Sequence, residues 1–175
     1  MHLFTSLRQR FYRGFEALLA PFRRVDDEPA ASFLSPQAFA LFRRMNAADR
    51  AHSLRVFAWL QAHGPQEDAL WTAGLLHDCG KAAAHLAVWQ RTLKVLLRKL
   101  APHYWRQLSS PVPPDDWRYP FYILAEHPQI GARWAREAGC SELTCWLIAH
   151  HEAEVPSDHP HSLLLQALQH ADAAS

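Results

Sequence analysis

Hydrophobic residues recur at steps of three and four positions along most of the chain, a spacing that places them on one face of a helix. The first such run lies in residues 1–24 and consists of Phe4, Leu7, Phe11, Phe15, Leu18 and Phe22. Arginines are scattered through the same segment, so an N-terminal amphipathic helix is predicted there. Its apolar face fits packing against the rest of the protein or a second subunit, and it also fits peripheral contact with a membrane. The pattern leaves both alternatives open.

The polar, proline-containing stretch at residues 26–32, DDEPAAS, predicts a linker. We therefore divide the chain into residues 1–32, the amphipathic helix and linker, and residues 33–175, the main domain. No segment shows the alternation typical of strands, so the sequence predicts an all-α fold. Helices are expected from residue 36 and over residues 49–63, 66–79, 85–100, 120–126, 128–138, 141–151 and 160–172, with loops at residues 109–119 and 152–160.

Single residues mark where several of these helices begin and end. Ser35 and Ser141 suit N-terminal caps. Gly64, which precedes a proline, stops one helix, and Pro102 ends the helix over residues 85–100. Gly80 stands where a left-handed C-terminal cap belongs, after the helix over residues 66–79.

The composition narrows the class of protein. With 175 residues, of which 49% are hydrophobic, the chain can bury one substantial core, and its net charge of +1 predicts no duplex nucleic acid as partner. Cys79, Cys140 and Cys145 form no CxxC pair, so neither a disulfide framework nor a structural zinc site is expected, in keeping with a cytoplasmic protein. The N-terminus does not resemble a signal peptide, and the uncharged stretches are far shorter than the roughly 20 residues that cross a bilayer.

Histidine is abundant, with 12 in the chain, and the most informative pair is His77-Asp78 in LLHDCGK. His77 lies on the apolar side of its helix, and His52 lies on the corresponding side of the preceding helix. Asp172 lies near the end of the last helix, beyond a leucine-rich stripe. Buried imidazoles and carboxylates need partners, and a divalent metal is one. His52, His77, Asp78 and Asp172 therefore form a candidate set of metal ligands.

Further histidines suggest a second metal. His127 follows the helix over residues 120–126, and the pair His150-His151 closes the helix that begins at Ser141. Adjacent side chains on a helix diverge by about 100 degrees, so the two need not bind the same ion. We favour His151 as the direct ligand, with His150 as a co-ligand or a supporting residue.

The order of these residues resembles that of the HD superfamily of metal-dependent phosphohydrolases. The resemblance covers about residues 35–175 and is carried by LLHDCGK, by HPQIGA from His127 and by IAHHE up to Glu152. It implies an all-helical bundle in which His52, His77, Asp78 and Asp172 hold one divalent ion. In members with the additional histidines, it implies a second ion on His127 and His150 or His151, with Asp78 bridging the two.

The resemblance also implies the chemistry. A metal-activated water would cleave a phosphate ester or anhydride of a small phosphorylated substrate, most often a nucleotide, with Asp78 and Lys81 as catalytic residues. The ligand types accept Mn, Fe, Co, Ni, Mg or Zn. A metal- and nucleotide-binding regulatory module without turnover is the alternative, and a helical interaction protein with merely buried histidines is another.

Two features bear on the substrate. The residues after the histidine pair, AEVPSDHP, lack the glycine-tyrosine-proline signature of the branch that hydrolyses cyclic di-GMP. The chain is more similar to small bacterial HD proteins, some of which cleave dinucleoside polyphosphates. The helix over residues 85–100 and its exit carry a run of bases, which fits either a solvated face or a basic rim for a polyanionic substrate or a nucleic acid. These bases are Arg91, Lys94, Arg98, Lys99 and Arg106.

Overall fold

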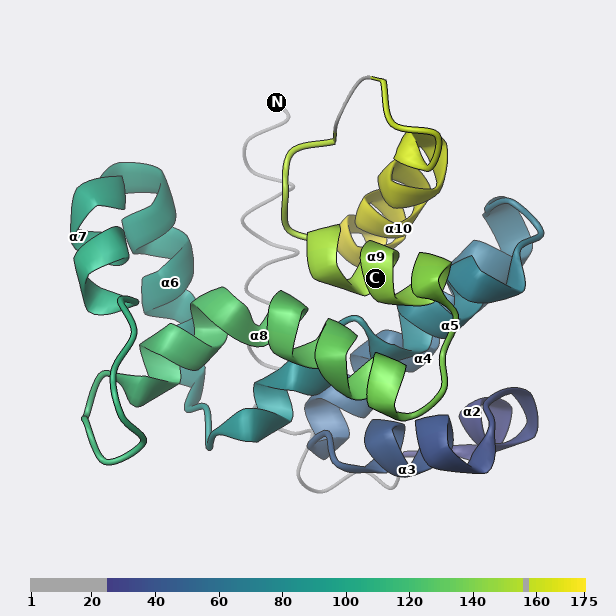
Figure 1. Cartoon of the computed structure of the whole chain (residues 1–175), viewed down its shortest axis with the longest axis horizontal. Helices are drawn as coiled ribbons and strands as arrows, with labels where there is room; N and C mark the ends of the chain where they lie inside the picture. Colours follow the sequence, from purple (N-terminus) through teal and green to yellow (C-terminus); the bar gives the residue numbers. More distant parts are fainter. Residues whose placement is uncertain (1–24, 156–157) are drawn as a thin grey trace, which may run out of the picture.

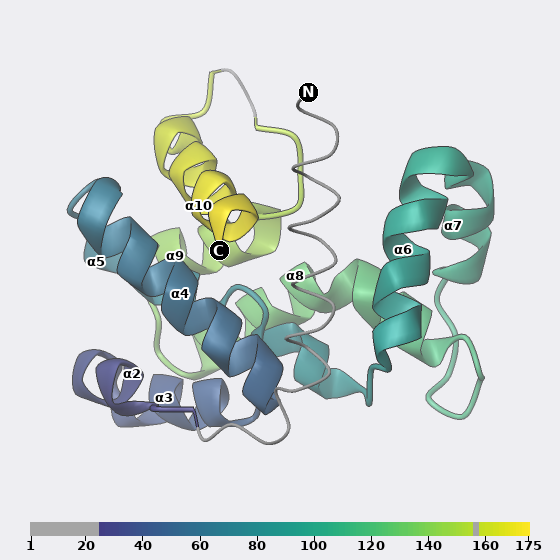
Figure 2. The same ribbon diagram turned by 180° about the vertical axis from the view of Figure 1, so that it is seen from behind.

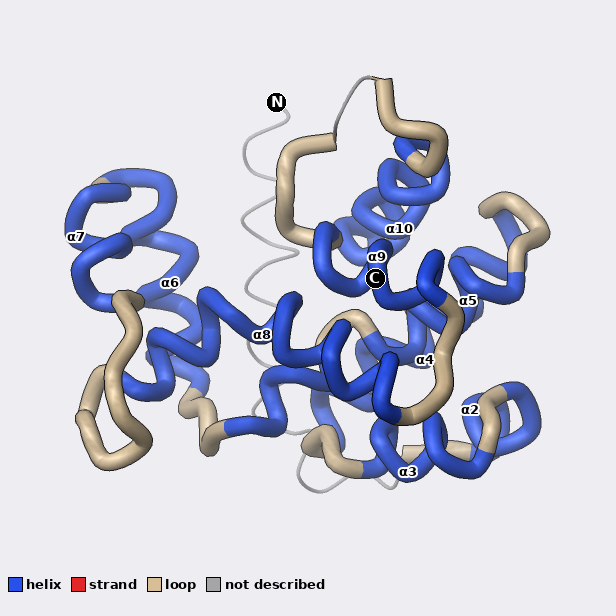
Figure 3. The backbone as a smooth tube through the Cα atoms, in the orientation of Figure 1, coloured by secondary structure: helices blue, strands red, loops and turns tan. Residues whose placement is uncertain are grey.

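The computed structural model describes residues 25–155 and 158–175, which form nine α-helices and one short 3-10 helix (Figure 1). Within these residues the backbone consists of helices and loops without a strand, so the all-α prediction is confirmed (Figure 3). The elements are α2 (Glu28–Phe33), α3 (Pro36–Arg43), α4 (Ala47–His63), α5 (Asp68–Leu76), η2 (Cys79–Ala83), α6 (Val88–Leu100), α7 (Pro102–Leu108), α8 (Tyr119–Glu137), α9 (Glu142–His150) and α10 (Ser162–Ala174). The amphipathic helix predicted over residues 1–24 lies outside the described residues. None of the described helices is long and apolar enough to cross a bilayer.

Helix α8 crosses the middle of the molecule and organises the packing (Figure 1). It packs against α9 and η2, while α5 packs between α4 and α9, and α10 lies against α4. The helices meet around a continuous core of fully buried side chains because their apolar stripes face one another. The largest of these side chains include Phe42, Leu60, Leu70, Leu75, Leu76, Leu147, Ile148, Leu165 and Leu168.

Local side-chain chemistry fixes several helix starts. The Ser35 hydroxyl accepts a hydrogen bond from the Ala38 amide at 3.3 Å, and the Ser141 hydroxyl accepts one from the Thr144 amide at 3.1 Å. Both predicted caps are therefore confirmed. Asn46 caps α4 in the same way, through a 3.0 Å bond from the Asp49 amide.

The linker predicted at residues 26–32 is wrong in its secondary structure. Helix α2 begins at Glu28, and the Ala30 side chain is fully buried in the core. Two ion pairs tie the start of this helix to the following ones, because Asp27 contacts Arg43 at 2.7 Å and Arg50 at 3.0 Å. Small and acidic residues, with a proline in the first turn, suit a short helix as well as a loop.

Two further helix predictions are corrected. The two helices expected on either side of Pro128 are one continuous helix, α8, with Pro128 inside it. Pro102 does end α6, but it also begins α7. A proline is tolerated in the first turn of a helix because the amide proton that it lacks would have no acceptor within the helix. A proline therefore marks a possible boundary without deciding which side of it is helical.

Helices α6 and α7 form a hairpin at one end of the molecule, beside the first half of α8 (Figure 2). Leu93 and Leu97 of α6 pack against a small separate cluster on α7 and α8. The helical spacing also places Trp89 and Leu100 on this apolar face, but they are 59% and 75% exposed, whereas Lys94 is buried. Helix α6 thus turns part of its basic face toward the protein.

Candidate metal centre

Six of the seven predicted metal ligands converge from five different parts of the fold. They form two groups, and within each group the ligand atoms lie within 4.8 Å of one another. One group is His52, His77 and Asp172, and the other is Asp78, His127 and His151.

The first group joins α4, the end of α5 and α10. His52 Nε2 lies 2.8 Å from Asp172 Oδ1, at hydrogen-bond distance, and His77 Nε2 lies 3.7 Å from the same oxygen. His77 is completely buried, while the side chain of Asp172 is 40% exposed. This group therefore has one open side toward solvent.

Asp78 connects the two groups. Its Oδ2 lies 3.6 Å from His77 Nε2, while its Oδ1 lies 3.4 Å from His127 Nε2 and 3.8 Å from His151 Nε2. The two carboxylate oxygens thus face different histidines, which is the placement that a bridging ligand requires.

These separations fit ligands of a shared cation. Two ligand atoms at about 2.1 Å from a tetrahedral ion lie about 3.4 Å apart. The Nε2 atoms of His77 and His127 are buried and have no hydrogen-bond partner. Buried polar atoms without a partner are costly, and a metal ion would satisfy both. The donor set of imidazoles and carboxylates suits a divalent metal.

A hydrogen bond from the other ring nitrogen, Nδ1, fixes the tautomer of each of the three buried histidines. The Nδ1 atoms of His77, His127 and His151 lie 3.0, 3.1 and 2.7 Å from the backbone oxygen three residues earlier in each case. A carbonyl only accepts, so each Nδ1 carries the proton and donates it. The lone pair of each Nε2 then faces the cluster, as in metal sites where the second ring nitrogen holds a ligand in place.

The carbonyls that accept these bonds are free for a structural reason. Gly74 and Ile148 lie in the last turns of α5 and α9, where carbonyl groups have no helical donor. Leu124 lies in the middle of α8, but the residue four positions later is Pro128, which has no amide proton. Pro128 therefore leaves the Leu124 carbonyl free to orient His127.

Charge in the cluster is already suited to binding a cation. Burial lowers the pKa of His127, and burial together with the neighbouring His77 and His127 rings lowers the pKa of His151 to about 3. Burial opposes ionisation of Asp78, but Lys81 and His77 outweigh it and hold its pKa well below the usual range. At neutral pH the His127 and His151 rings are neutral and the aspartate is charged, which is the state that ligates metals.

Close backbone packing places Asp78 beside α8. Gly80 lies in η2, and a Cβ atom on it would come within 2.1 Å of the His127 carbonyl oxygen. The left-handed cap predicted for Gly80 is wrong, since among the described glycines only Gly139 has a positive φ. Glycine is needed at position 80 because η2 and α8 approach too closely for any side chain.

Two charged residues extend the cluster toward α6. Lys81 Nζ donates to Asp78 Oδ2 at 2.6 Å. Glu152 Oε1 accepts from Lys94 Nζ at 2.5 Å and lies 3.7 Å from His127 Nε2. Glu152 was not singled out from the sequence, where it falls at the start of an expected loop. Its position directly after His151, a predicted metal ligand, was the available signal.

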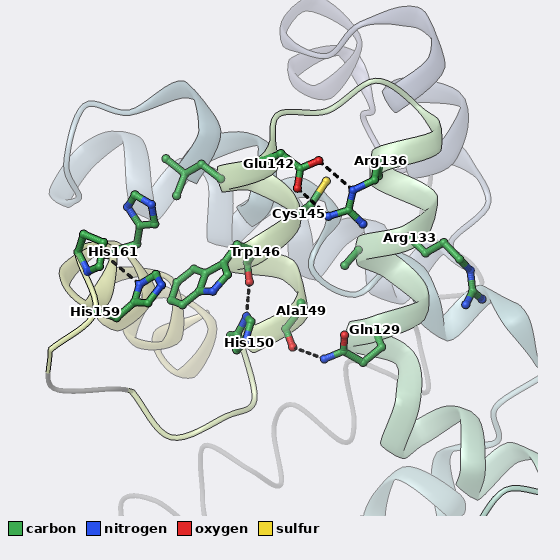
Figure 4. Close-up of a pocket in the computed structure, with 13 residues that line it drawn as sticks. Gln129, Arg133, Arg136, Glu142, Cys145, Trp146, Ala149, His150, His159 and His161 are labelled. Atoms are coloured by element: carbon green, nitrogen blue, oxygen red, sulfur yellow. Dashed lines mark hydrogen bonds and ion pairs between the residues drawn. The ribbon is translucent and has the colours of Figure 1, made fainter.

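His150 does not join the cluster. Its Nδ1 lies 2.8 Å from the Trp146 carbonyl, and its ring stacks on the Trp146 indole with 4.5 Å between centroids. Figure 4 shows it lining a different pocket, together with His159 and His161. The angular offset between neighbours on a helix sends His151 inward and His150 to this other side.

Comparisons with known proteins bear on the same residues. The model of the HD domain family matches residues 50–175, a range that begins just before His52 and includes Asp172. Neither a curated protein nor a solved structure matches the chain.

Proposed function

The chain belongs to the HD domain family, and on that premise we propose that it is a metal-dependent phosphohydrolase acting on a small phosphorylated substrate, in particular a nucleotide. The observation that carries the proposal is the placement of Asp78 between two groups of ligands, with the unpartnered Nε2 atoms of His77 and His127 facing it. We infer two divalent ions drawn from Mn, Fe, Co, Ni, Mg and Zn.

The residues divide into two ligand sets that share one carboxylate. His52, His77 and Asp172 would hold one ion and His127 and His151 the other. Asp78 would contribute to both, through Oδ2 on one side and Oδ1 on the other. Bound divalent ions supply Lewis acidity, which makes water a better nucleophile and offsets charge on a phosphoryl group.

Lys81 is the proposed partner of the substrate itself. Its ammonium lies against Asp78 and its side chain is only 16% exposed, so it is held beside the ligands. Asp78 and burial act on this amine in opposite directions, and the net effect raises its pKa. A permanently charged ammonium at this point would bind a phosphoryl oxygen and stabilise the negative charge that develops during cleavage.

The test is hydrolysis of a panel of nucleotides and simple phosphate esters with each divalent metal in turn, alongside metal analysis of the purified protein. Asp78→Asn should lose both bound metal and turnover. Lys81→Ala should keep the metal and lose rate by roughly a hundredfold. Asp115→Asn, in the exposed loop before α8, is the matched control and should change neither.

The outcomes separate the alternatives. Bound metal and nucleotide without turnover would indicate a regulatory module. Failure to bind any divalent ion would leave only a helical interaction protein. Equal rates for Lys81→Ala and the unaltered protein would remove Lys81 from the mechanism while leaving the metal centre in place.

A further inference from the structure

Helix α6 leaves an apolar face uncovered by the rest of the described chain. Eight large hydrophobic side chains are exposed among the described residues, and five of them lie on this one helix. We call these five the outer face of α6, and they are Val88, Trp89, Val95, Leu96 and Leu100. Exposed hydrophobic side chains on a monomer are normally scattered singly, whereas a contiguous group marks an interaction site.

The five side chains are neighbours on the surface of the helix. Val88 and Val95 are two turns apart, as are Trp89 and Leu96, and Leu100 follows one turn after Leu96. The two rows lie side by side because each differs from the other by one position along the helix. The rise from Val88 to Leu100 is about 18 Å. The outer face is therefore one strip that runs the length of α6, in the hairpin at one end of the molecule (Figure 2).

The opposite side of α6 already has partners within the protein. Leu93 and Leu97 pack against the small cluster on α7 and α8. Lys94 Nζ donates to Glu152 Oε1 at 2.5 Å, and the same oxygen lies 3.7 Å from His127 Nε2. The position of α6 is thus fixed from behind, and one helix separates the outer face from the candidate metal centre.

The charge of the hairpin narrows the choice of partner. Residues 88–108 contain five lysines and arginines and no aspartate or glutamate. A second copy of the chain docked through the same face would bring two basic hairpins together. Residues 1–24, the predicted amphipathic helix, carry five arginines against one glutamate, so they too would meet like charge. Like charges across an interface are unfavourable, and an anionic partner is therefore the complementary one.

Two of these cations are available to an external anion. The ion pairs of the hairpin involve Arg91, Lys94 and Arg98. Lys99 and Arg106 are exposed and make no ion pair with any other described residue. A partner that carries negative charge could therefore reach both without breaking a contact within the protein.

The position of Lys99 favours a lipid surface over an acidic protein. Lys99 follows Leu96 by three residues and Val95 by four, so it lies within the outer face. A protein that covered this face would bury the ammonium and would need a carboxylate placed opposite it. At a lipid surface the hydrocarbon stem of a lysine can lie among apolar groups while its charged end reaches the headgroups. Trp89 fits the same boundary, where aromatic rings concentrate.

We propose that the outer face of α6 docks on an anionic lipid surface. Its apolar side chains enter the boundary between headgroups and acyl chains, and Lys99 and Arg106 contact the anionic headgroups. The docking holds the proposed metal centre one helix away from the surface. The inference stands apart from the proposed function, since no residue of the outer face is a candidate metal ligand.

The experiment measures sedimentation of the full chain with vesicles of two compositions, one of equal parts phosphatidylcholine and phosphatidylglycerol and the other of phosphatidylcholine alone. Affinity for the anionic vesicles should be at least about tenfold higher and should fall as salt is added. The double variant Leu96→Gln, Leu100→Gln should lower that affinity by at least about tenfold, because two apolar side chains no longer leave water.

Leu163→Gln is the matched control, because Leu163 on α10 and Leu100 on α6 are both 75% exposed. It should bind the anionic vesicles as the unaltered protein does. Lys99→Gln should lower the affinity by about fivefold, the contribution of one cation near a charged surface. Leu100→Gln alone is the safeguard against misfolding of the double variant, and it should lower the affinity by part of the same factor.

Several outcomes would overturn the proposal. Unchanged vesicle affinity in the double variant would assign membrane binding to another part of the chain. Equal affinity for the two vesicle compositions would show that the basic residues contribute nothing. A dimer of the unaltered protein that the double variant abolishes, seen by sedimentation velocity without vesicles, would show that a second copy covers the outer face instead. Metal binding and turnover of a water-soluble ester should be the same in Leu100→Gln and the unaltered protein, so the two proposals are tested separately.

Discussion

The Nε2 atom of His127 lies 3.4 Å from Asp78 Oδ1, although the two residues belong to different parts of the fold. The contact depends on Gly80, whose backbone lies against the His127 carbonyl. It also depends on the His127 ring orientation, which the bond to the Leu124 carbonyl sets. The backbone around each residue therefore fixes the geometry of the proposed bridging carboxylate.

The adjacent histidines provide the first prediction. His151→Gln should weaken divalent metal binding by at least about tenfold, because His151 faces Asp78 and its imidazole has no replacement. His150→Gln is the matched control, since this ring stacks on Trp146 instead of facing Asp78. Metal content by mass spectrometry and competition with a metallochromic indicator measure both. Loss of metal in the His150 variant alone would reverse the assignment.

The metal-free protein should lose stability as the pH falls below about 6.5. The unfolded chain protonates His151 near its ordinary value of 6.5, whereas the folded protein resists protonation until about pH 3. Between these values the unfolded state binds more protons, so the free energy of unfolding decreases as the pH is lowered. Urea denaturation of chelator-treated protein at pH 7.5, 6.5, 5.5 and 4.5 tests this.

The variant His151→Gln checks the source of that pH dependence. Removing the titrating ring should flatten the slope between pH 6.5 and 4.5, leaving the contribution of His127, whose pKa burial also lowers. A slope identical to that of the unaltered protein would show that His151 is not the group responsible.

The third prediction concerns the approach of η2 to α8. Gly80→Ala should lower the free energy of unfolding by about 1–3 kcal/mol or more, because its Cβ would meet a backbone oxygen that cannot move independently. The backbone movement that relieves this clash should also displace Asp78 and weaken metal binding. Gly74→Ala is the control, since its Cβ would meet the Leu60 side chain, which can rotate. Thermal unfolding of both proteins should rank them in that order.

Much of the fold follows from chemistry that acts over a few residues. Ser35 and Ser141 cap helices where a short polar side chain precedes an apolar run, and both were predicted for that reason. The inward direction of His52 and His77 followed from helical periodicity, because a histidine in register with apolar neighbours faces the same side. These features need no knowledge of distant contacts.

The features that the sequence did not predict depend on contacts between distant residues, or on residue types that suit more than one local structure. Periodicity revealed an apolar face on α6 but not its partners, so the exposure of Trp89 and the burial of Lys94 could not be foreseen. Gly80 is predicted as a left-handed helix cap because glycine permits a positive φ, whereas its role is to admit the backbone of α8. Glu152 gained its significance only when Lys94 and His127 were found beside it.

Pro128 gives the last prediction, in which stability and metal binding change in opposite directions. An alanine there restores an amide proton that can bond the Leu124 carbonyl, so the metal-free protein should gain up to about 3 kcal/mol in free energy of unfolding. The same amide competes with His127 Nδ1 for that carbonyl, which now lies 3.1 Å from the ring. Loss of this contact should weaken metal binding by about 10–100-fold.

Pro120→Ala is the matched control, because Pro120 lies in the first turn of α8, where an amide has no helical partner. Pro120→Ala should change neither the free energy of unfolding nor the metal affinity appreciably. Urea denaturation of the metal-free proteins gives the stabilities, and titration with a metal indicator gives the affinities. Unchanged metal affinity in Pro128→Ala would show that the ring of His127 is held by its packing alone, since the competing amide would then have had no effect on the ligand.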